Sequence, residues 1–380
     1  MTSTYNTKFP SVTELKALAQ KRIPKFAFNY LDGGIDDEKC KEHNRQSLNE
    51  IKLTPRYLQD INTVNTKVTL FEHDYNLPIG IAPVGLGNMM WPGAEIALAK
   101  AAQNANIPYV LSTFSTTLLE DIAKVAPDVC WYQLYLPKDD KTLKDIIKRV
   151  RQANYNALII TIDIPASAKR NREIKDGLQI PLKFSSNISW EFFSHPKWSM
   201  QTFKQGMPKL VNVTSYKKNT EISFHDFISD FMVTGVTKEH IIKIRKLWDG
   251  PLILKGIQDP NDILEVVKLG VDGLIISNHG GRQLDAAPSS IESLKKIPDG
   301  IKNKLTIMLD SGVRTGLDVI RAKSLGAEIV FSGRSFYWGV AALGKQGASQ
   351  VIEIYRDEIT RTLKQIGCHD FNKLDYTWLN

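Results

Sequence analysis

The chain has 380 residues, of which 42% are hydrophobic and 24% are charged, and its formal net charge is +8. A core can form without disulfides, and the three scattered cysteines show neither a disulfide framework nor a metal pattern. The lysines are spread out and no nucleic-acid-binding motif accompanies them, so we expect anionic small molecules rather than nucleic acid as partners. The chain shows neither a signal region nor a membrane-spanning run, which predicts a cytoplasmic protein.

The first 75 residues are predicted to form a helical segment. Residues 11–23, "SVTELKALAQKRI", begin at a serine with a glutamate three positions later, which is the pattern of a capping box. Residues 24–34, "PKFAFNYLDGG", begin with proline and end in two glycines, which are helix start and stop signals.

Eight short apolar runs follow, each ending in Gly, Ser, Thr, Asp or another polar residue. They are 77–85, 109–113, 130–135, 157–163, 252–256, 273–281, 306–312 and 328–334. Stretches with helical periodicity separate most of them, and buried parallel strands read as continuous apolar runs. The pattern predicts an α/β fold, a (β/α)8 TIM barrel. An open doubly wound sheet is the weaker alternative, because no strand is followed by GxGxxG.

One interval between strands is far too long for a barrel repeat. Residues 171–235 therefore form a predicted insertion after the fourth strand, within a single domain whose barrel spans 76–345 and whose C-terminal helix and tail span 346–380. Residues 181–220 hold six lysines, one glutamate and seven aromatic residues. Two interpretations stay open, namely a lid packed on protein and an amphipathic surface that rests on anionic lipid.

Polar side chains gather at the predicted C-terminal ends of the strands, where barrel active sites lie. The last two strands end in "DSGVR" and "SGR", whose glycines expose backbone N–H groups and whose arginines add cationic forks. Phosphate sites commonly form at this place in such barrels. Gly312, Arg314, Gly333 and Arg334 are therefore predicted to bind the phosphate of a cofactor.

The stretch "SNHGGRQLD", residues 277–285, begins at the polar end of the sixth run. His279 stands beside two glycines that let the backbone approach a ligand, and Arg282 can hold a carboxylate. Asp163, from the fourth strand, is placed to face the histidine and stabilise an imidazolium. No cluster of metal-binding spacing and no GxSxG motif is visible, so neither a metal site nor a serine nucleophile is expected.

These motifs, together with "LILKG", resemble the FMN-dependent α-hydroxy-acid dehydrogenase and oxidase family over about residues 10–370. "IAPVGL" and "HPKWSMQTFKQGMPKLVN" are most similar to the membrane-associated, quinone-linked bacterial L-lactate dehydrogenases. The resemblance implies His279 as the catalytic base, Asp163 as its partner, and Tyr135 beside them. It implies that the substrate is bound by Tyr30, Tyr135, Arg170, Arg282 and Phe114. It implies FMN contacts from Pro83, Val84, Gly85, Ser112, Gln133, Thr161, Lys255, Ser277, Asp310, Gly312, Arg314, Gly333 and Arg334.

The implied reaction is oxidation of an L-2-hydroxy acid, foremost L-lactate to pyruvate, with electrons passing to quinone or another acceptor. Gly85 stands where the oxidases carry alanine, which favours a dehydrogenase. Phe114 replaces a tryptophan of glycolate oxidase, so longer or aromatic hydroxy acids remain open. A peroxide-forming oxidase and a non-catalytic flavin-binding barrel are the alternatives. The resemblance also implies a homotetramer and a peripheral position on the inner face of the cell membrane.

Overall fold

Eight short parallel strands close into a barrel in the computed structural model, which describes residues 5–166, 168–178, 185–216 and 230–380. The strand order is β3-β4-β5-β6-β7-β8-β9-β10, and β10 pairs with β3 to complete the ring. The strands are β3 (Ile79–Ile81), β4 (Tyr109–Ser112), β5 (Cys130–Leu134), β6 (Ala157–Thr161), β7 (Leu252–Ile257), β8 (Gly273–Ile276), β9 (Thr306–Leu309) and β10 (Ile329–Ser332). Seven of the eight predicted runs contain one strand each, and the run 252–256 falls one residue short of the end of β7.

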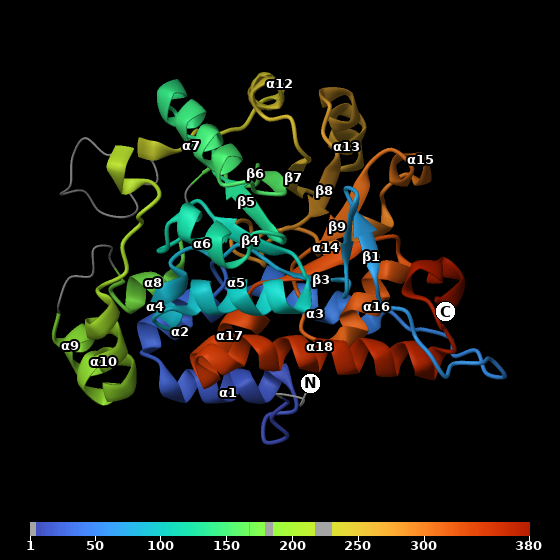
Figure 1. The fold of residues 1–380 in the computed structure, drawn as a ribbon, viewed down its shortest axis with the longest axis horizontal. Coiled ribbons are helices and arrows are strands. Elements are labelled where there is room, and N and C mark those ends of the chain that lie inside the picture. Colours follow the sequence, from blue (N-terminus) through green and yellow to red (C-terminus); the bar gives the residue numbers. More distant parts are fainter. Residues whose placement is uncertain (1–4, 167, 179–184, 217–229) are drawn as a thin grey trace.

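Helices cover the outside of this barrel (Figure 1). Those that follow the strands are α5 (Ala94–Ala105), α6 (Leu119–Val125), α7 (Asp140–Gln152), α12 (Lys238–Leu247), α13 (Pro260–Val266), α14 (Ser290–Lys295), α16 (Gly316–Ser324) and α17 (Arg334–Leu343). Shorter turns are α4 (Gly87–Met90) and α15 (Asp299–Lys302). The strand residues are buried almost throughout, because side chains point into the barrel on one face and against helices on the other. The predicted (β/α)8 fold is confirmed.

Helices from both ends of the chain pack together on one side of the barrel. α1 (Val12–Arg22) lies against α17, and the long α18 (Lys345–Ile366) lies against α17, α16 and α5 (Figure 1). The Ser11 side chain accepts from the backbone N–H of Glu14, and the Glu14 side chain returns the bond, as the capping box predicts. α2 (Lys25–Asp32) follows and ends at Gly33, and α3 (Lys39–Glu50) completes the N-terminal helices.

A two-stranded hairpin within the first 75 residues was not predicted. β1 (Val68–Leu70) pairs antiparallel with β2 (His73–Tyr75). Its Tyr75 hydroxyl accepts from the indole N–H of Trp131 at 3.0 Å, and the ring of Phe71 lies 5.9 Å from that of Trp131. Trp131 stands near the start of β5, so the hairpin covers the N-terminal end of the barrel, away from the ends that carry the polar residues.

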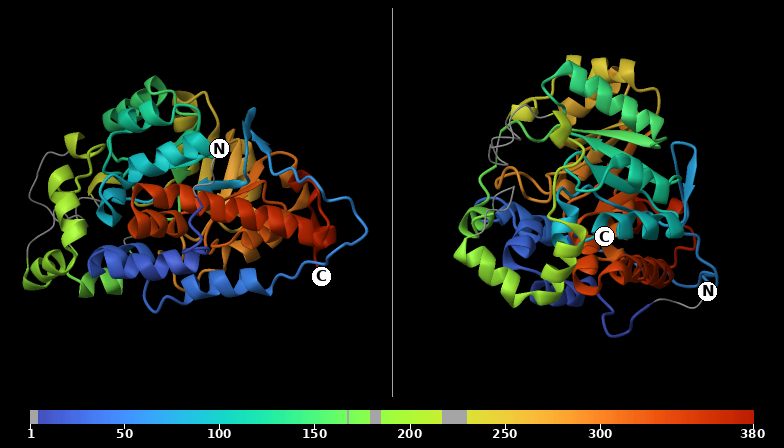
Figure 2. Two further views of the ribbon diagram at one scale, coloured as in Figure 1. Left: turned by 60° about the horizontal axis from the view of Figure 1, so that its bottom comes forward. Right: turned by 60° about the vertical axis from the view of Figure 1, so that its left-hand side comes forward.

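The interval after β6 holds α8 (Asn171–Lys175), α9 (Ser186–Ser194) and α10 (Pro196–Gln205). Figures 1 and 2 show α9 and α10 at one end of the molecule, opposite the loop of residues 55–65. Residues 181–184 and 217–220 of the predicted amphipathic segment lie outside the described residues. Among the described helices, none has both the length and the apolar character to cross a membrane.

Candidate functional site

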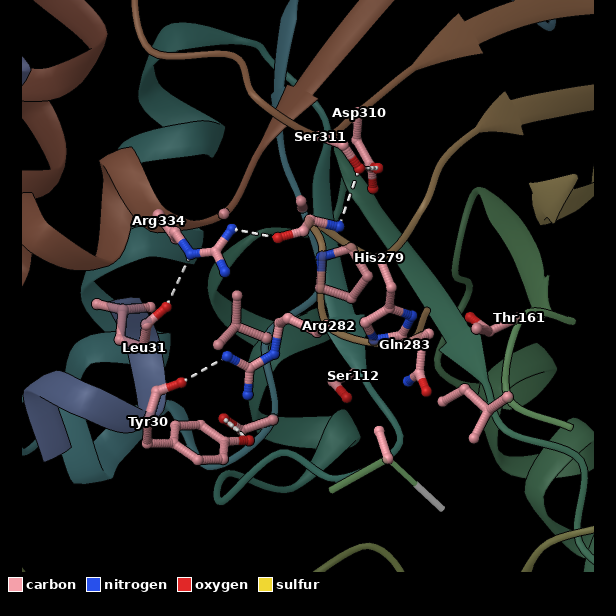
Figure 3. A pocket seen from close by; sticks show the side chains of 18 of the residues that line it. Tyr30, Leu31, Ser112, Thr161, His279, Arg282, Gln283, Asp310, Ser311 and Arg334 are labelled. Atoms are coloured by element: carbon pink, nitrogen blue, oxygen red, sulfur yellow. Dashed lines mark hydrogen bonds between the residues drawn. The ribbon is translucent and has the colours of Figure 1, made fainter. Parts of the chain in front are cut away.

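A cavity of about 560 Å³ opens at the C-terminal ends of the barrel strands. Its size suits a cofactor together with a small substrate. Most of the predicted site residues line it, namely Tyr30, Pro83, Val84, Gly85, Ser112, Phe114, Tyr135, Thr161, Arg170, Lys255, His279, Arg282, Asp310, Gly312, Arg314, Gly333 and Arg334. Figure 3 shows several of these side chains turned toward one another from different strands and from α2.

The other three predicted residues stand one layer behind the cavity wall and support it. Asp163 bonds to His279 at 2.9 Å, and the Ser277 hydroxyl accepts from the Lys255 ammonium at 2.8 Å. Gln133 accepts from the Ser112 hydroxyl through its Oε1 at 3.1 Å. The structure thus divides the predicted residues into those that line the cavity and those that stand behind its wall.

His279 and Asp163 form a buried pair at the mouth of the barrel. Nδ1 of His279 lies 2.9 Å from Oδ1 of Asp163, and Nε2 lies 3.3 Å from the Tyr135 hydroxyl. Burial lowers the pKa of His279 below 6.5, although the Asp163 carboxylate opposes this. Gly256 makes the approach of Asp163 possible, because its φ is +105° and a Cβ there would lie 2.5 Å from the Asp163 side chain. The histidine is thus neutral near pH 7 and oriented by a carboxylate.

His279 adopts a backbone conformation that non-glycine residues rarely take. Its φ is +58°, and Ser311 after the next strand has φ +76°. The Ser311 hydroxyl accepts from the backbone N–H of Gly280 at 2.9 Å, which ties the two strand ends together. Such strain persists where the surrounding structure holds it, and here it turns the imidazole into the cavity.

Lys255 is a buried cation in the wall formed by the middle strands. Its ammonium lies 3.2 Å from Oδ2 of Asp310, and the Lys255 side chain is only 5% exposed. Burial would lower the pKa of Lys255, but the charges of Asp310 and Asp163 outweigh burial and raise it. Lys255 therefore carries its positive charge into the cavity at all physiological pH values.

Two buried polar groups along the same wall have no hydrogen-bond partner in the part of the chain that the structure describes. The Nε2 of Gln133 and the Oγ1 of Thr161 are buried without a hydrogen bond among the described residues. Leaving such groups unpaired costs roughly 1–3 kcal/mol each. A flavin ring, which carries alternating donors and acceptors on its polar edge, fits this donor set.

Two buried arginines lie at the ends of the last two strands. Burial lowers the pKa of Arg314 to about 10 and that of Arg334 to about 9, and the mutual repulsion of the two guanidiniums adds to the effect on Arg334. Neither forms an ion pair within the described part of the chain. Two guanidiniums that lack an anion, beside the backbone of Gly312 and Gly333, fit a phosphate.

The guanidinium of Arg334 is held by backbone oxygens. It donates to the carbonyls of Leu31 at 2.9 Å (Figure 3), Gly280 at 2.8 Å and Gly33 at 2.7 Å. A side chain at position 280 would be strained at a φ of +68°, and its Cβ would lie 2.7 Å from Nη1 of Arg334, so the guanidinium would have to shift. These contacts fix the guanidinium with carbonyls of α2 and of the loop after β8.

Arg282 and Arg170 enter the cavity from two different loops. Nη1 of Arg282 donates to the carbonyl of Tyr30 at 2.8 Å (Figure 3). It also donates to the carbonyl of Gly33 at 2.8 Å. Arg170 keeps a buried Nε that has no partner among the described residues. That free donor, next to an anchored guanidinium, provides a place for a substrate carboxylate.

Glu173 was not predicted as a site residue, yet it lines the cavity and contacts both arginines. Its Oε1 lies 3.0 Å from Nη2 of Arg282 and 3.4 Å from Nη1 of Arg170. Other lining residues that the sequence did not indicate include Gln283, Ser311, Met232 and Leu178. A glutamate in a charged insertion gives no signal of its own, because its partners are distant in sequence.

Apolar and aromatic side chains form another part of the cavity wall. The ring of Phe114 stacks on that of Tyr135 with centroids 4.9 Å apart, and the cavity is also lined by Met232 and Ile164. The place of a Cβ on Gly85 is 3.3 Å from both the Tyr30 hydroxyl and the Phe114 Cβ. A methyl group at position 85 would therefore press on two predicted substrate contacts.

A family model described as FMN-dependent dehydrogenase matches residues 19–380. The chain belongs to this family, and it is an FMN-dependent oxidoreductase of the α-hydroxy-acid dehydrogenase type. The resemblance that the sequence motifs carry is thereby confirmed.

The chain is 34% identical over 368 residues to L-lactate dehydrogenase of Acinetobacter baumannii, which covers 96% of each chain. It is also 34% identical to (S)-mandelate dehydrogenase of Pseudomonas putida, with 97% of this chain and 93% of that one covered. A crystal structure described as the monotopic membrane protein (S)-mandelate dehydrogenase superposes with a TM-score of 0.93, at 33% identity, over 98% of this chain and 100% of the other.

Proposed function

We propose that the protein oxidises an L-2-hydroxy acid, foremost L-lactate to pyruvate, and passes the electrons to a quinone. The observation that carries the proposal is the His279–Asp163 pair, which faces the cavity that the Arg170 and Arg282 guanidiniums also enter. A base and a carboxylate-binding pair in one cavity are the two groups that a 2-hydroxy acid requires. A barrel that only binds flavin needs neither of them.

In the proposed reaction, FMN supplies the two-electron acceptor when it is bound. Arg282 and the free Nε of Arg170 hold the substrate carboxylate, and the Tyr135 hydroxyl is placed to orient the substrate hydroxyl. Nε2 of His279 takes the proton, because its lowered pKa leaves it neutral near pH 7. Asp163 then stabilises the imidazolium through Nδ1 at 2.9 Å.

Lys255 and the arginines Arg314 and Arg334 are proposed to hold FMN, together with the donors of Gln133 and Thr161. Lys255 keeps its charge in the dry wall of the barrel, where it favours negative charge on a neighbouring group. The two arginines and the backbone N–H groups near Gly312 and Gly333 would receive the phosphate.

A longer or aromatic hydroxy acid, such as mandelate, is the second candidate substrate. The observation that favours it is the apolar wall of Phe114, Met232 and Ile164, which offers more contact than a methyl group uses. Gly85, which leaves room between Phe114 and Tyr30, supports a dehydrogenase rather than a peroxide-forming oxidase.

The visible spectrum of the FMN-loaded protein tests this proposal. Anaerobic L-lactate is expected to bleach the flavin absorbance, with slow recovery in air and fast recovery with a soluble quinone analogue. Bleaching by (S)-mandelate alone would move the substrate assignment to the second candidate, and fast recovery in air would identify an oxidase. A flavin that no 2-hydroxy acid bleaches would contradict the proposed function.

We further propose that α9 and α10 rest on the inner face of the cell membrane. Their large apolar side chains Trp190, Phe193, Met200 and Phe203 are 63%, 77%, 52% and 66% exposed. The exposed Lys197, Lys204 and Lys209 are suited to anionic headgroups. The monotopic relative that superposes on this chain supports the proposal.

Replacing Trp190, Phe193 and Phe203 with serine is expected to weaken binding to anionic vesicles by at least about 10-fold, since each apolar side chain contributes roughly 1.5–3 kcal/mol when fully buried. Vesicle co-sedimentation measures the effect. A matched control replaces the exposed Tyr57 and Leu58 at the opposite end of the molecule. Equal binding of both variants and the wild type would contradict the membrane assignment.

A further inference from the structure

Glu173 places a carboxylate between the two cavity arginines. Its Oε1 lies within hydrogen-bonding distance of both, 3.0 Å from Nη2 of Arg282 and 3.4 Å from Nη1 of Arg170. The side chains of Arg170, Glu173 and Arg282 are 22%, 18% and 13% exposed. Water therefore screens these three charges weakly.

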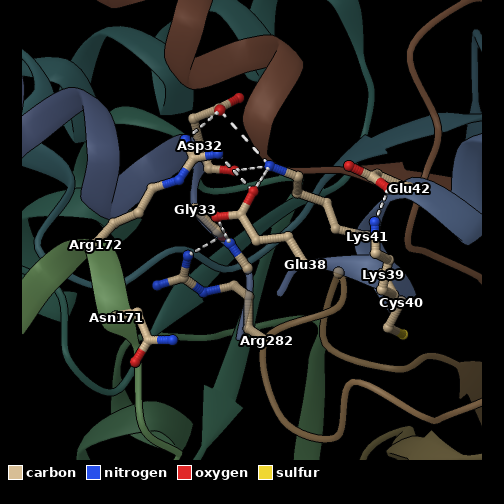
Figure 4. A network of polar contacts seen from close by, with 12 residues as sticks. Asp32, Gly33, Glu38, Lys39, Cys40, Lys41, Glu42, Asn171, Arg172 and Arg282 are labelled. Atoms are coloured by element: carbon tan, nitrogen blue, oxygen red, sulfur yellow. Dashed lines mark hydrogen bonds and ion pairs between the residues drawn. The ribbon is translucent and has the colours of Figure 1, made fainter. Parts of the chain in front are cut away.

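The helix that carries Glu173 is fastened to the N-terminal helices by separate ion pairs. The Arg172 guanidinium lies 3.1 Å from Oδ2 of Asp32 and 2.6 Å from Oε2 of Glu38 (Figure 4). The Asn29 amide donates to Asp176 at 2.6 Å. Because these contacts already fix α8, Glu173 is not needed to attach the helix, and its contact with the arginines calls for another explanation.

The charges of the three groups set what the cavity accepts. Two guanidiniums and one carboxylate leave a net charge of +1, which one substrate carboxylate neutralises. Burial and the charge of the neighbouring Arg170 lower the pKa of Arg282, whereas the Glu173 carboxylate raises it. The two guanidiniums therefore repel each other, and Glu173 offsets part of that repulsion. A substrate with two carboxylates would leave one negative charge without a partner. That charge would lie close to the Glu173 carboxylate and be repelled by it.

We propose that Glu173 is a specificity-determining residue that restricts the arginine pair to monocarboxylates and disfavours dicarboxylates. The inference rests on the proposed function, since it assumes that Arg170 and Arg282 bind the carboxylate of the substrate. Glu173 restricts the substrate without contacting the reacting carbon. Its carboxylate neutralises one of the two guanidinium charges, which a second substrate carboxylate would otherwise pair with.

The test compares propionate with malonate, in which a second carboxylate replaces the methyl group of propionate. Both are titrated into the FMN-loaded enzyme while the flavin absorbance is followed, at a pH where both malonate carboxyls are ionised. In Glu173→Gln, the affinity ratio of malonate to propionate is expected to rise by about 10-fold or more, because the site gains one net positive charge. Glu173→Asp, which keeps the charge, is expected to keep the wild-type ratio.

Arg172→Gln is the matched control, because it removes two ion pairs of the same helix, with Asp32 and Glu38, that do not involve Arg170 or Arg282. It is expected to leave the ratio unchanged even if both affinities fall. An unchanged ratio in Glu173→Gln, with both affinities reduced alike, would show that Glu173 has only a structural role and would overturn the inference.

The wild-type enzyme provides a measurement that does not depend on how the variants fold. It is expected to bind propionate at least as tightly as malonate, and a strong preference for malonate would overturn the inference. A wild-type enzyme that binds neither anion at the flavin would contradict the proposed function itself, which separates the two failures.

Discussion

Replacing His279 with glutamine is expected to abolish the bleaching of the flavin by substrate while the bound flavin itself remains. Glutamine keeps a polar side chain of similar length but cannot accept a proton near neutral pH. A positioned general base contributes roughly 100-fold to 10,000-fold to the rate, so the anaerobic reduction rate is expected to fall by this range. Stopped-flow absorbance with L-lactate, or with whichever hydroxy acid reacts, measures the loss.

His43→Gln is the control for this experiment, because His43 pairs with Glu292 away from the cavity and is 40% exposed. It is expected to react like the wild type. An His279→Gln variant that still reduces its flavin at the wild-type rate would remove His279 from the reaction.

The pH dependence of kcat/KM provides a second test of His279 as the base. The base works only when neutral, and burial lowers its pKa below 6.5, so kcat/KM is expected to decline only as the pH falls below 6.5. Asp163 raises this pKa by its charge. In Asp163→Asn the acid limb is therefore expected to shift to lower pH, while the maximal rate falls because the imidazolium loses its partner.

Arg170→Met is the other change with a large expected effect. It removes the buried Nε that is free to receive the substrate carboxylate and leaves Glu173 with Arg282 alone. Removing one partner of a buried charge pair costs roughly 2–5 kcal/mol, so kcat/KM is expected to fall by about 30-fold or more. Steady-state kinetics and the affinity for propionate measure it.

Arg170→Lys separates charge from geometry in that experiment. It keeps the positive charge but lacks the planar fork, so it is expected to recover only part of the loss. Full activity in Arg170→Met would mean that the substrate carboxylate binds elsewhere. A loss of FMN in this variant would instead show that Arg170 maintains the cavity.

The barrel was predictable because each of its strands must be buried on both faces. The run 157–161, for example, is apolar throughout and becomes β6, whose residues are all buried. The β1–β2 hairpin was not predictable, because the polar residues His73 and Asp74 interrupt its apolar pattern. Phe71 and Tyr75 contact Trp131 of the barrel. The stability of the hairpin comes from the contact with Trp131, which is distant in sequence.

The site was predictable where residues follow a strand directly. His279 and Asp310 stand at such places, and the fold brings them to one end of the barrel. Tyr30 and Arg170 lie outside the strands, so only the family resemblance indicated them. Glu173 was not predicted, because only its contacts with Arg170 and Arg282 identify it as a site residue. Those two arginines come together only in the folded chain.

Carbonyl oxygens at the end of α2 accept hydrogen bonds from both Arg282 and Arg334, in addition to the Glu173 carboxylate that pairs with Arg282. The C-terminal end of a helix carries partial negative charge. A carbonyl oxygen, unlike aspartate, takes up no proton in mild acid, and no side-chain substitution deletes it. These main-chain contacts therefore orient the two guanidiniums independently of the side chains of α2. They are expected to persist in mild acid and after substitutions in α2, as long as the helix keeps its position.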